Sequence, residues 1–226
     1  MKSSTKYTPT DLNQVIYPST AVERRINGYA TKQLEGHVML YGPNGTGKTT
    51  LANLLAQTIG ESDPHLESKD FDELLSTANL KDYMKQACSY ARLTTSGKYF
   101  MVLNEFDNAK RGVSKFWAAL DACGDDAMAI ITTNHPMEID RSIRSRFDMI
   151  EMPAIRASQA LQRVQFTLRS EGLSLPDAQV LHYLKQQEHS MDLRKYFKTA
   201  DELLFLSRNH LPMPAWSAAP PALKVI

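Results

Sequence analysis

Short apolar runs alternate with longer amphipathic segments through the first two thirds of the chain. The runs HVMLYG, KYFMVLNEFD, AMAIITTN and DMIEMP predict strands that are buried on both faces of a sheet. Between them, TGKTTLANLLAQTIG, FDELLSTANLKDYMKQACSYARL and SKFWAALDACG repeat apolar residues at helical spacing, the second with a break at TANL. Strands joined through helices of this length need crossover connections. The pattern therefore predicts an α/β fold with a parallel, doubly wound sheet.

The strand pattern stops after residue 154. Three helical patterns follow, SQALQRVQFTLRSEG, DAQVLHYLKQQE and DLRKYFKTADELLFLSR, and the last residues are rich in proline and alanine. We therefore expect an α/β domain over residues 1–154, a small all-helical domain over residues 155–210 and an irregular tail over residues 211–226.

Composition excludes several classes of protein. Lys and Arg number 26 and Asp and Glu 25, so the net charge is +1 and any contact with nucleic acid needs a local basic face. The two cysteines, Cys88 and Cys123, have no CxxC spacing, which favours reduced thiols. The polar N-terminus does not resemble a signal peptide, and no apolar run has the length of a membrane span. We expect a cytoplasmic protein, or one of the host cytoplasm if it is viral, without a membrane partner.

The segment GPNGTGKT, from Gly42 to Thr49, matches the pattern G-x-x-x-x-G-K-[ST] and lies between a predicted strand and a predicted helix. Its glycines let successive backbone N–H groups point at phosphate oxygens, and the helix N-terminus adds its positive end. Lys48 is expected to reach the β and γ phosphates, and the Thr49 hydroxyl to bind Mg²⁺. The predicted nucleotide-binding residues of this segment are Gly42, Pro43, Asn44, Gly45, Thr46, Gly47, Lys48, Thr49 and Thr50.

Further candidate residues follow the later strands. The strand MVLNEFD delivers Asn104 toward the metal and Glu105 toward the attacking water, and IITTNHP places Asn134 at the end of the next strand, where it can orient the same water. Arg144 and Arg146 precede the last strand, where a guanidinium can reach a γ-phosphate in a neighbouring subunit. Arg194 lies on a helix of the second domain, from which it can sense the nucleotide.

With these motifs in order, the chain resembles the AAA+ ATPases, and most closely the ATPase subunits of cellular and bacteriophage sliding-clamp loaders. GPNGTGKTT is similar to the Walker A loop, VLNEFD to the Walker B strand, ITTNHPMEIDRSIRSRF to sensor 1 with the trans-acting arginine, and DLRK to the sensor 2 helix. KYTPTDLNQVIYP resembles the segment that lies against the adenine. The resemblance covers residues 6–205 and implies an AAA+ P-loop NTPase with a helical lid domain, ATP and Mg²⁺ as cofactors, and assembly with other AAA+ subunits. DNA and a sliding clamp are its implied partners.

The chain departs from the family at three positions. Thr8 replaces an arginine of the opening motif, and Phe147 replaces the cysteine that follows the trans-acting arginine. Asn104 replaces the Walker B aspartate, which removes a negative charge worth about 3 kcal/mol per unit of metal charge at about 5 Å in a dielectric near 20. Asparagine keeps an acceptor oxygen, and phosphates and waters hold most of the Mg²⁺ in such sites. Because Glu105 and Asn134 remain, we expect slow, partner-stimulated hydrolysis.

Two functions stay open at this point. Glu105, Asn134 and Arg146 favour an ATP-hydrolysing subunit of an oligomeric machine of DNA replication, in which Arg146 completes the site of a neighbour. Asn104 favours an ATP-dependent assembly or matchmaker protein of a phage or mobile element, with little or no hydrolysis. So does the fact that the resemblance does not extend to the collar domain of clamp-loader subunits. The basic residues Lys110, Arg111 and Lys115 are candidates for DNA contact or simply a solvated turn.

Overall fold

The computed structural model describes residues 3–106 and 112–216. These residues form two compact units. One unit contains residues 9–153, and the other contains residues 3–8 together with residues 154–216. The chain therefore passes between the units at two points, after residue 8 and after residue 153.

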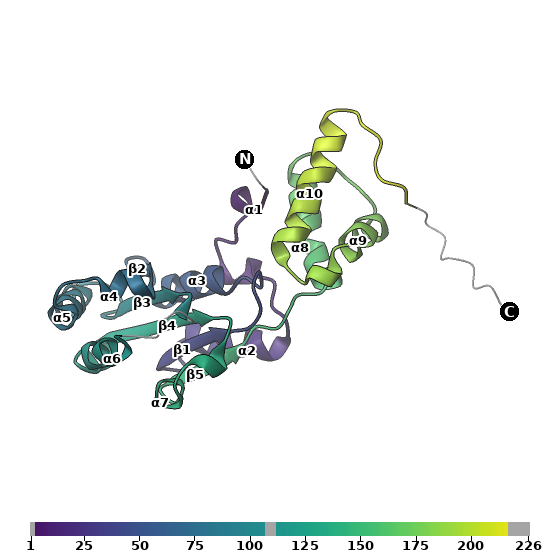
Figure 1. The fold of residues 1–226 in the computed structure, drawn as a ribbon. Coiled ribbons are helices and arrows are strands. Elements are labelled where there is room, and N and C mark those ends of the chain that lie inside the picture. Colours follow the sequence, from purple (N-terminus) through teal and green to yellow (C-terminus); the bar gives the residue numbers. More distant parts are fainter. Residues whose placement is uncertain (1–2, 107–111, 217–226) are drawn as a thin grey trace. The chain divides into compact units, whose positions relative to one another are not determined.

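The first unit is built on a parallel sheet, as the sequence predicts (Figure 1). Its strands lie in the order β2-β3-β4-β1-β5, and every pair of neighbours is parallel. The strands are β1 (His37–Tyr41), β2 (His65–Asp70), β3 (Tyr99–Asn104), β4 (Ala127–Thr133) and β5 (Phe147–Glu151). Four of the five coincide with the predicted apolar runs. Strand β2, HLESKD, lacks such a run because it is an edge strand with partly exposed polar side chains.

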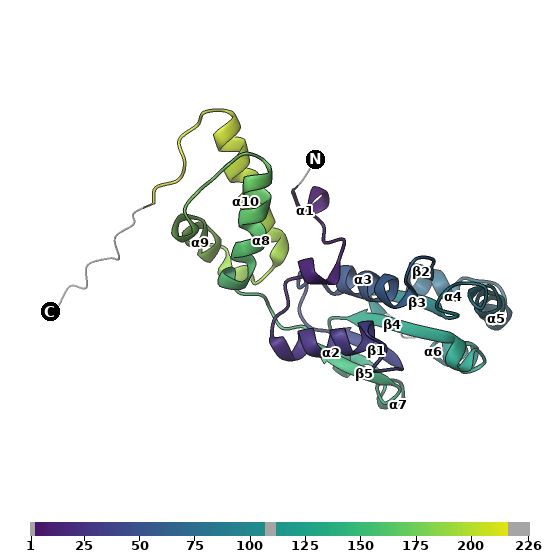
Figure 2. The same cartoon turned by 180° about the vertical axis from the view of Figure 1, so that it is seen from behind.

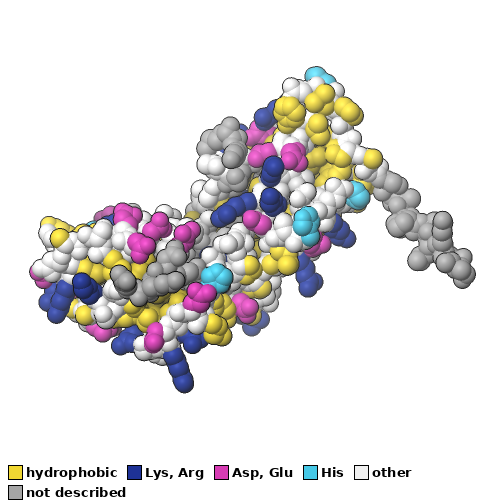
Figure 3. Space-filling model, in the orientation of Figure 1, with side chains coloured by type: hydrophobic (Ala, Val, Ile, Leu, Met, Phe, Trp, Pro, Cys, Tyr) yellow, Lys and Arg dark blue, Asp and Glu magenta, His cyan; other side chains and the backbone are white. Residues whose placement is uncertain are grey.

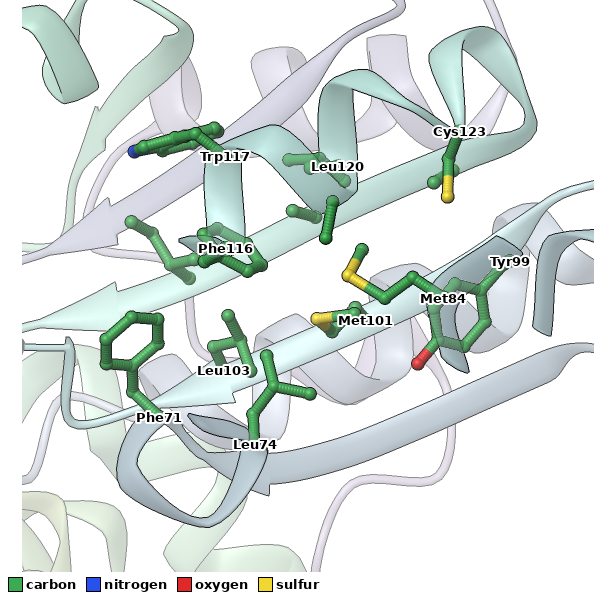
Figure 4. Close-up of a cluster of buried hydrophobic side chains, with 14 of the residues drawn as sticks. Phe71, Leu74, Met84, Tyr99, Met101, Leu103, Phe116, Trp117, Leu120 and Cys123 are labelled. Carbon is green, nitrogen blue, oxygen red and sulfur yellow. The ribbon is translucent and has the colours of Figure 1, made fainter. Parts of the chain in front are cut away.

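Helices cover both faces of this sheet (Figures 1 and 2). Alternate residues of each strand point to opposite faces. Met39, Met101 and Ile131 therefore join the cluster under α4, α5 and α6, whereas Val38 and Ile130 join the cluster under α2 and α3. Figure 4 shows the first cluster. The helices are α2 (Thr20–Ala30), α3 (Lys48–Gly60), α4 (Phe71–Leu75), α5 (Leu80–Ala91), α6 (Val113–Asp121) and α7 (Arg141–Arg144), with short 3-10 turns at Leu12–Gln14, Gly124–Asp126 and Pro136–Glu138.

The second unit is helical, and no strand occurs among its described residues. Its helices are α1 (Ser3–Lys6), α8 (Ala157–Ser170), α9 (Asp177–Lys185) and α10 (Leu193–Arg208), with a 3-10 turn at Glu188–Ser190. Apolar residues at helical spacing form its interior, among them Val164, Leu168, Val180, Leu184 and Leu203. The Tyr196 hydroxyl is anchored there and donates to the carbonyl of Ile155 at 3.1 Å.

Residues 3–8 belong to the same compact unit as the helical residues, whereas we expected the α/β domain to begin at residue 1. Glu171, at the end of α8, is the centre of this contact. Its carboxylate accepts from the Tyr7 hydroxyl at 2.6 Å and forms ion pairs with Lys6 and Arg208. Arg163 donates to the Tyr7 carbonyl at 2.9 Å. Because Tyr7 and Glu171 lie 164 positions apart, local sequence patterns give no signal for this contact.

Replacing Glu171 with glutamine is expected to loosen residues 3–8 from the helical unit. Hydrogen bonds from Lys6 and Tyr7 lower the pKa of Glu171 to about 2, so the carboxylate is fully charged at neutral pH. The charge therefore stabilises the contact above the usual pKa of 4.5, and this contribution is lost as the pH falls through about 2. Hydrogen exchange of the N-terminal peptide at pH 7, followed by mass spectrometry, measures the change.

Glu202→Gln is the matched control, because Glu202 is an exposed residue of α10 that pairs only loosely with Lys198, at 3.8 Å. We expect faster exchange over residues 3–8 in Glu171→Gln and wild-type exchange in the control. Equal exchange in all three proteins would show that Glu171 does not hold the segment.

Candidate nucleotide-binding site

The predicted phosphate loop connects β1 to α3. Gly42 has a φ of +143°, and a Cβ at this position would lie 2.2 Å from the carbonyl oxygen of Met152, so only glycine fits. Gly47 caps α3 with a φ of +85°, a left-handed conformation. Thr46 is buried, and its hydroxyl donates to the Pro43 carbonyl at 3.1 Å. The loop sequence thus produces a strand-to-helix turn that ends at the N-terminus of α3, a position where helices bind anions.

The remaining loop residues differ in exposure. Pro43, Asn44 and Thr49 are exposed, whereas Gly45 and Thr50 are half-buried. Thr49 is an exposed residue of the first turn of α3, from which its hydroxyl would bind the metal ion. The structure therefore brings all the predicted residues from Gly42 to Thr50 into one turn.

Lys48 is buried although it is a cation, and its three N–H groups have polar partners. Its Nζ lies 2.8 Å from the Gly42 carbonyl, 2.8 Å from the Pro43 carbonyl and 2.9 Å from Oδ1 of Asn134. These neutral acceptors offset the cost of burying the ammonium. Phosphate oxygens are stronger acceptors for an ammonium than neutral carbonyls, so a nucleotide can take their place. The contact also joins Asn134, which follows β4, to the phosphate loop.

Asn104 and Glu105 lie at the same end of the sheet as this loop. The strands are parallel, so their carboxyl ends lie together there, and β4 separates β3 from β1. Asn104 ends β3 and is half-buried. Its Nδ2 donates to Oγ of Ser68 at 3.3 Å. Glu105 is exposed and has a φ of +51°, which is rare for a residue other than glycine and is often found at functional sites.

The surroundings of Oδ1 of Asn104 bear on whether the site can bind Mg²⁺. The atom is buried and has no hydrogen-bond partner within residues 3–106 and 112–216. Such an unpaired acceptor costs about 1–3 kcal/mol, and a metal-bound water would satisfy it. The described residues contain no group of three or more His, Cys, Asp or Glu side chains able to hold a metal by themselves. Asn104 and Thr49 therefore fit a metal that arrives with the nucleotide's phosphates.

Arg146 is the more exposed of the two arginines that precede β5. Its guanidinium lies over the Trp117 ring, 5.3 Å from the centroid, and donates to the Ser142 carbonyl at 2.8 Å. Arg144 is half-buried and donates to Sδ of Met137 at 3.1 Å. Trp117 itself is buried on α6 and packs edge-on against Phe147. The exposure of Arg146 suits a group that acts outside its own chain.

Arg194 lies in the helical unit and not in the unit that carries the phosphate loop. It is exposed in the first turn of α10, where its backbone N–H donates to the capping side chain of Asp192 at 2.8 Å. Its role toward the nucleotide therefore remains a proposal.

Sequence reasoning missed two side chains near the candidate site. One is Ser68, which belongs to β2, the strand that has no apolar run. The other is Trp117, whose contact with Arg146 joins residues of separate elements.

Of the basic residues considered for DNA, Lys110 and Arg111 lie outside the described residues, whereas Lys115 is exposed on α6. Figure 3 shows both signs of charge interspersed on the visible face. Among the described residues, no helix is long and apolar enough to cross a bilayer.

Residues 38–153 match the family described as ATPase family associated with various cellular activities (AAA). The match spans more than half of the chain and includes the phosphate loop, both asparagines and Arg146. The protein belongs to this AAA family. Membership of an ATPase family implies that the loop binds a nucleotide, in agreement with its geometry.

Among curated proteins, the chain is similar to subunits of replication factor C. A small subunit from Thermofilum pendens is 27% identical over 214 residues, which cover 90% of this chain and 63% of that protein. A large subunit from Thermococcus kodakarensis is 25% identical over 196 residues, which cover 84% of this chain and 38% of that protein. The chain thus spans less than two thirds of the length of these relatives.

Solved structures agree on the fold. The AAA domain of FIGL-1 superposes with a TM-score of 0.68 at 17% identity, covering 90% of this chain and 74% of that one. A RuvB variant from Thermotoga maritima superposes with a TM-score of 0.69 at 15% identity, covering 91% and 68%. At these identities the likeness confirms the AAA+ architecture of sheet and helices, and nothing about substrates.

Proposed function

We propose that this protein is an ATP-binding and ATP-hydrolysing subunit of an oligomeric, DNA-associated machine that resembles a clamp loader. One observation carries the proposal. Lys48 joins the phosphate loop to Asn134, and this group lies at the carboxyl end of the parallel sheet, where β3 also ends. The names of the replication factor C relatives support a place in DNA replication.

Each residue has a distinct part in this proposal. The loop and Lys48 hold the phosphates, while Thr49 and Asn104 bind Mg²⁺ directly or through its waters. When bound, Mg²⁺ neutralises charge on the phosphates. Glu105 polarises the attacking water and Asn134 orients it.

Two arginines complete the proposed mechanism. Arg146 of one subunit stabilises the charge that develops on the γ-phosphate in a neighbour. Arg194, on the helical unit, is the proposed sensor of the nucleotide and of its hydrolysis. Other AAA+ subunits are therefore the first proposed partners, in a ring or spiral. DNA and a sliding clamp are the next.

Assembly and turnover, measured in the same samples, test this function. We expect Mg²⁺ and ATP to shift the protein to a larger species in sedimentation velocity. Primed DNA, a single-stranded template with an annealed primer, should raise steady-state ATP turnover. The same template without a primer and a fully paired duplex are the controls for the DNA structure. ATP-dependent assembly without turnover on any DNA would instead support the assembly or matchmaker function.

A further inference from the structure

The guanidinium of Arg146 is held by neutral groups of its own chain. Its Cζ lies 5.3 Å from the centroid of the Trp117 ring, and its Nη1 donates to the Ser142 carbonyl at 2.8 Å. Within residues 3–106 and 112–216, Arg146 forms no ion pair with a carboxylate. No described carboxylate therefore neutralises the positive charge of this exposed side chain.

An aromatic ring holds a guanidinium differently from a carboxylate. A carboxylate occupies the N–H groups in a bidentate pair and cancels the positive charge. A ring attracts the cation through its face, and it takes up no N–H donor in doing so. Indole has the strongest attraction of the three aromatic rings for a cation. Trp117 can therefore orient Arg146 and still leave its charge and N–H groups for a phosphate.

Trp117 is itself fixed by packing. It is buried on α6, and its ring contacts those of Phe116 and Phe147, with centroids 5.0 Å and 5.4 Å away. Figure 4 shows Trp117 and Phe116 on this helix. Phe147 directly follows Arg146 and stands where the clamp-loader family has cysteine, so this departure supplies a packing partner for the tryptophan. A side chain locked in this way is a firm support for the arginine that lies over it.

We propose that Trp117 is a positioning residue that holds the Arg146 guanidinium, through the face of its ring, in the direction needed to meet the γ-phosphate of a neighbouring subunit. This inference rests on the proposed function of Arg146 and adds to it a residue of α6. Trp117 then serves the nucleotide site of the neighbour and not the site of its own subunit.

Replacing Trp117 with leucine removes the ring and keeps an apolar side chain in the core. We expect ATP turnover of the assembled protein to fall about tenfold, while ATP affinity stays at the wild-type value. Trp117→Phe keeps a ring and should retain most of the turnover. Trp216→Leu changes the other tryptophan of the chain, which belongs to the helical unit, and as the control for loss of an indole it should turn over ATP like the wild type.

A mixing experiment separates this function from a general contribution to folding. In a mixture of Glu105→Gln and Arg146→Ala subunits, turnover comes from Arg146→Ala sites that a Glu105→Gln neighbour completes with its arginine. Trp117→Leu is then added to one component at a time. We expect turnover to fall about tenfold when the change is in the Glu105→Gln subunit, and to stay at the level of the parent mixture when it is in the Arg146→Ala subunit.

The outcomes distinguish failure of this inference from failure of the proposed function. Equal turnover with the change in either component overturns the function of Trp117, while action of Arg146 on a neighbour stands. No turnover in the wild type, or none in a parent mixture that assembles, overturns the proposed function and the inference with it. A loss confined to the subunit that supplies the arginine supports both. If thermal unfolding shows that Trp117→Leu does not fold, Trp117→Met, whose flexible side chain fills irregular space, takes its place in the same mixtures.

Discussion

Replacing Arg146 with alanine is expected to lower ATP turnover about a thousandfold in the assembled protein, the lower limit for loss of an arginine that completes a phosphoryl-transfer site. ATP affinity should stay at the wild-type value, because the proposed contact forms with a neighbour's nucleotide. The exposed guanidinium rests on Trp117 and on the Ser142 carbonyl, so its removal leaves the core intact. Steady-state turnover and equilibrium ATP binding, measured on the same preparation, give the two numbers.

Arg141→Ala is the matched control, because Arg141 is also exposed and begins the same short helix, α7. Mixing experiments then test action between subunits. A Glu105→Gln subunit has an inactive site of its own but an intact Arg146, so mixing it with Arg146→Ala should restore part of the turnover. No recovery in mixtures that still assemble would contradict action on a neighbour.

Replacing Lys48 with methionine is expected to weaken ATP binding by a factor on the order of a hundred to a thousand, as for other buried charged contacts that lose one partner. Methionine keeps an unbranched stem and removes the ammonium that phosphates would bind in place of the Gly42, Pro43 and Asn134 oxygens. Equilibrium binding of a fluorescent ATP analogue measures the loss, and thermal unfolding without nucleotide monitors the fold.

Lys81→Met controls for the loss of one positive charge, since Lys81 is an exposed lysine of α5. It should bind ATP like the wild type. Wild-type binding by Lys48→Met would mean that the loop does not hold the phosphates in the way its geometry indicates.

The sequence predicts those parts of the molecule that local patterns determine. Buried parallel strands are continuous apolar runs, so four strands and the helices between them can be read directly. The phosphate loop is also local, because the tight approach of Gly42 to Met152 and the left-handed Gly47 need glycine at fixed spacing. The positions of Asn104 and Asn134 can also be predicted, because parallel strands place the residues at their carboxyl ends on the same side of the sheet.

Contacts between distant segments are harder to predict. Strand β2 is held by pairing with β3 at the sheet edge and not by an apolar run of its own, and Ser68 was missed with it. The attachment of residues 3–8 to Glu171 depends on charges far apart in the sequence. The stacking of Arg146 on Trp117 depends on how α6 and β5 pack. In each case the pairing partner, and not the segment alone, determines the structure.

Steady-state ATP turnover with Mg²⁺ and primed DNA tests the central claim most directly, for the wild type beside Glu105→Gln and Asn104→Asp. Glu105 has the left-handed backbone conformation at the end of β3 and is the proposed residue that polarises water. We predict slow but measurable turnover in the wild type and none in Glu105→Gln, with equal ATP binding in both. A silent wild type beside an active Asn104→Asp would contradict hydrolysis and show that ATP serves this protein as a ligand for assembly.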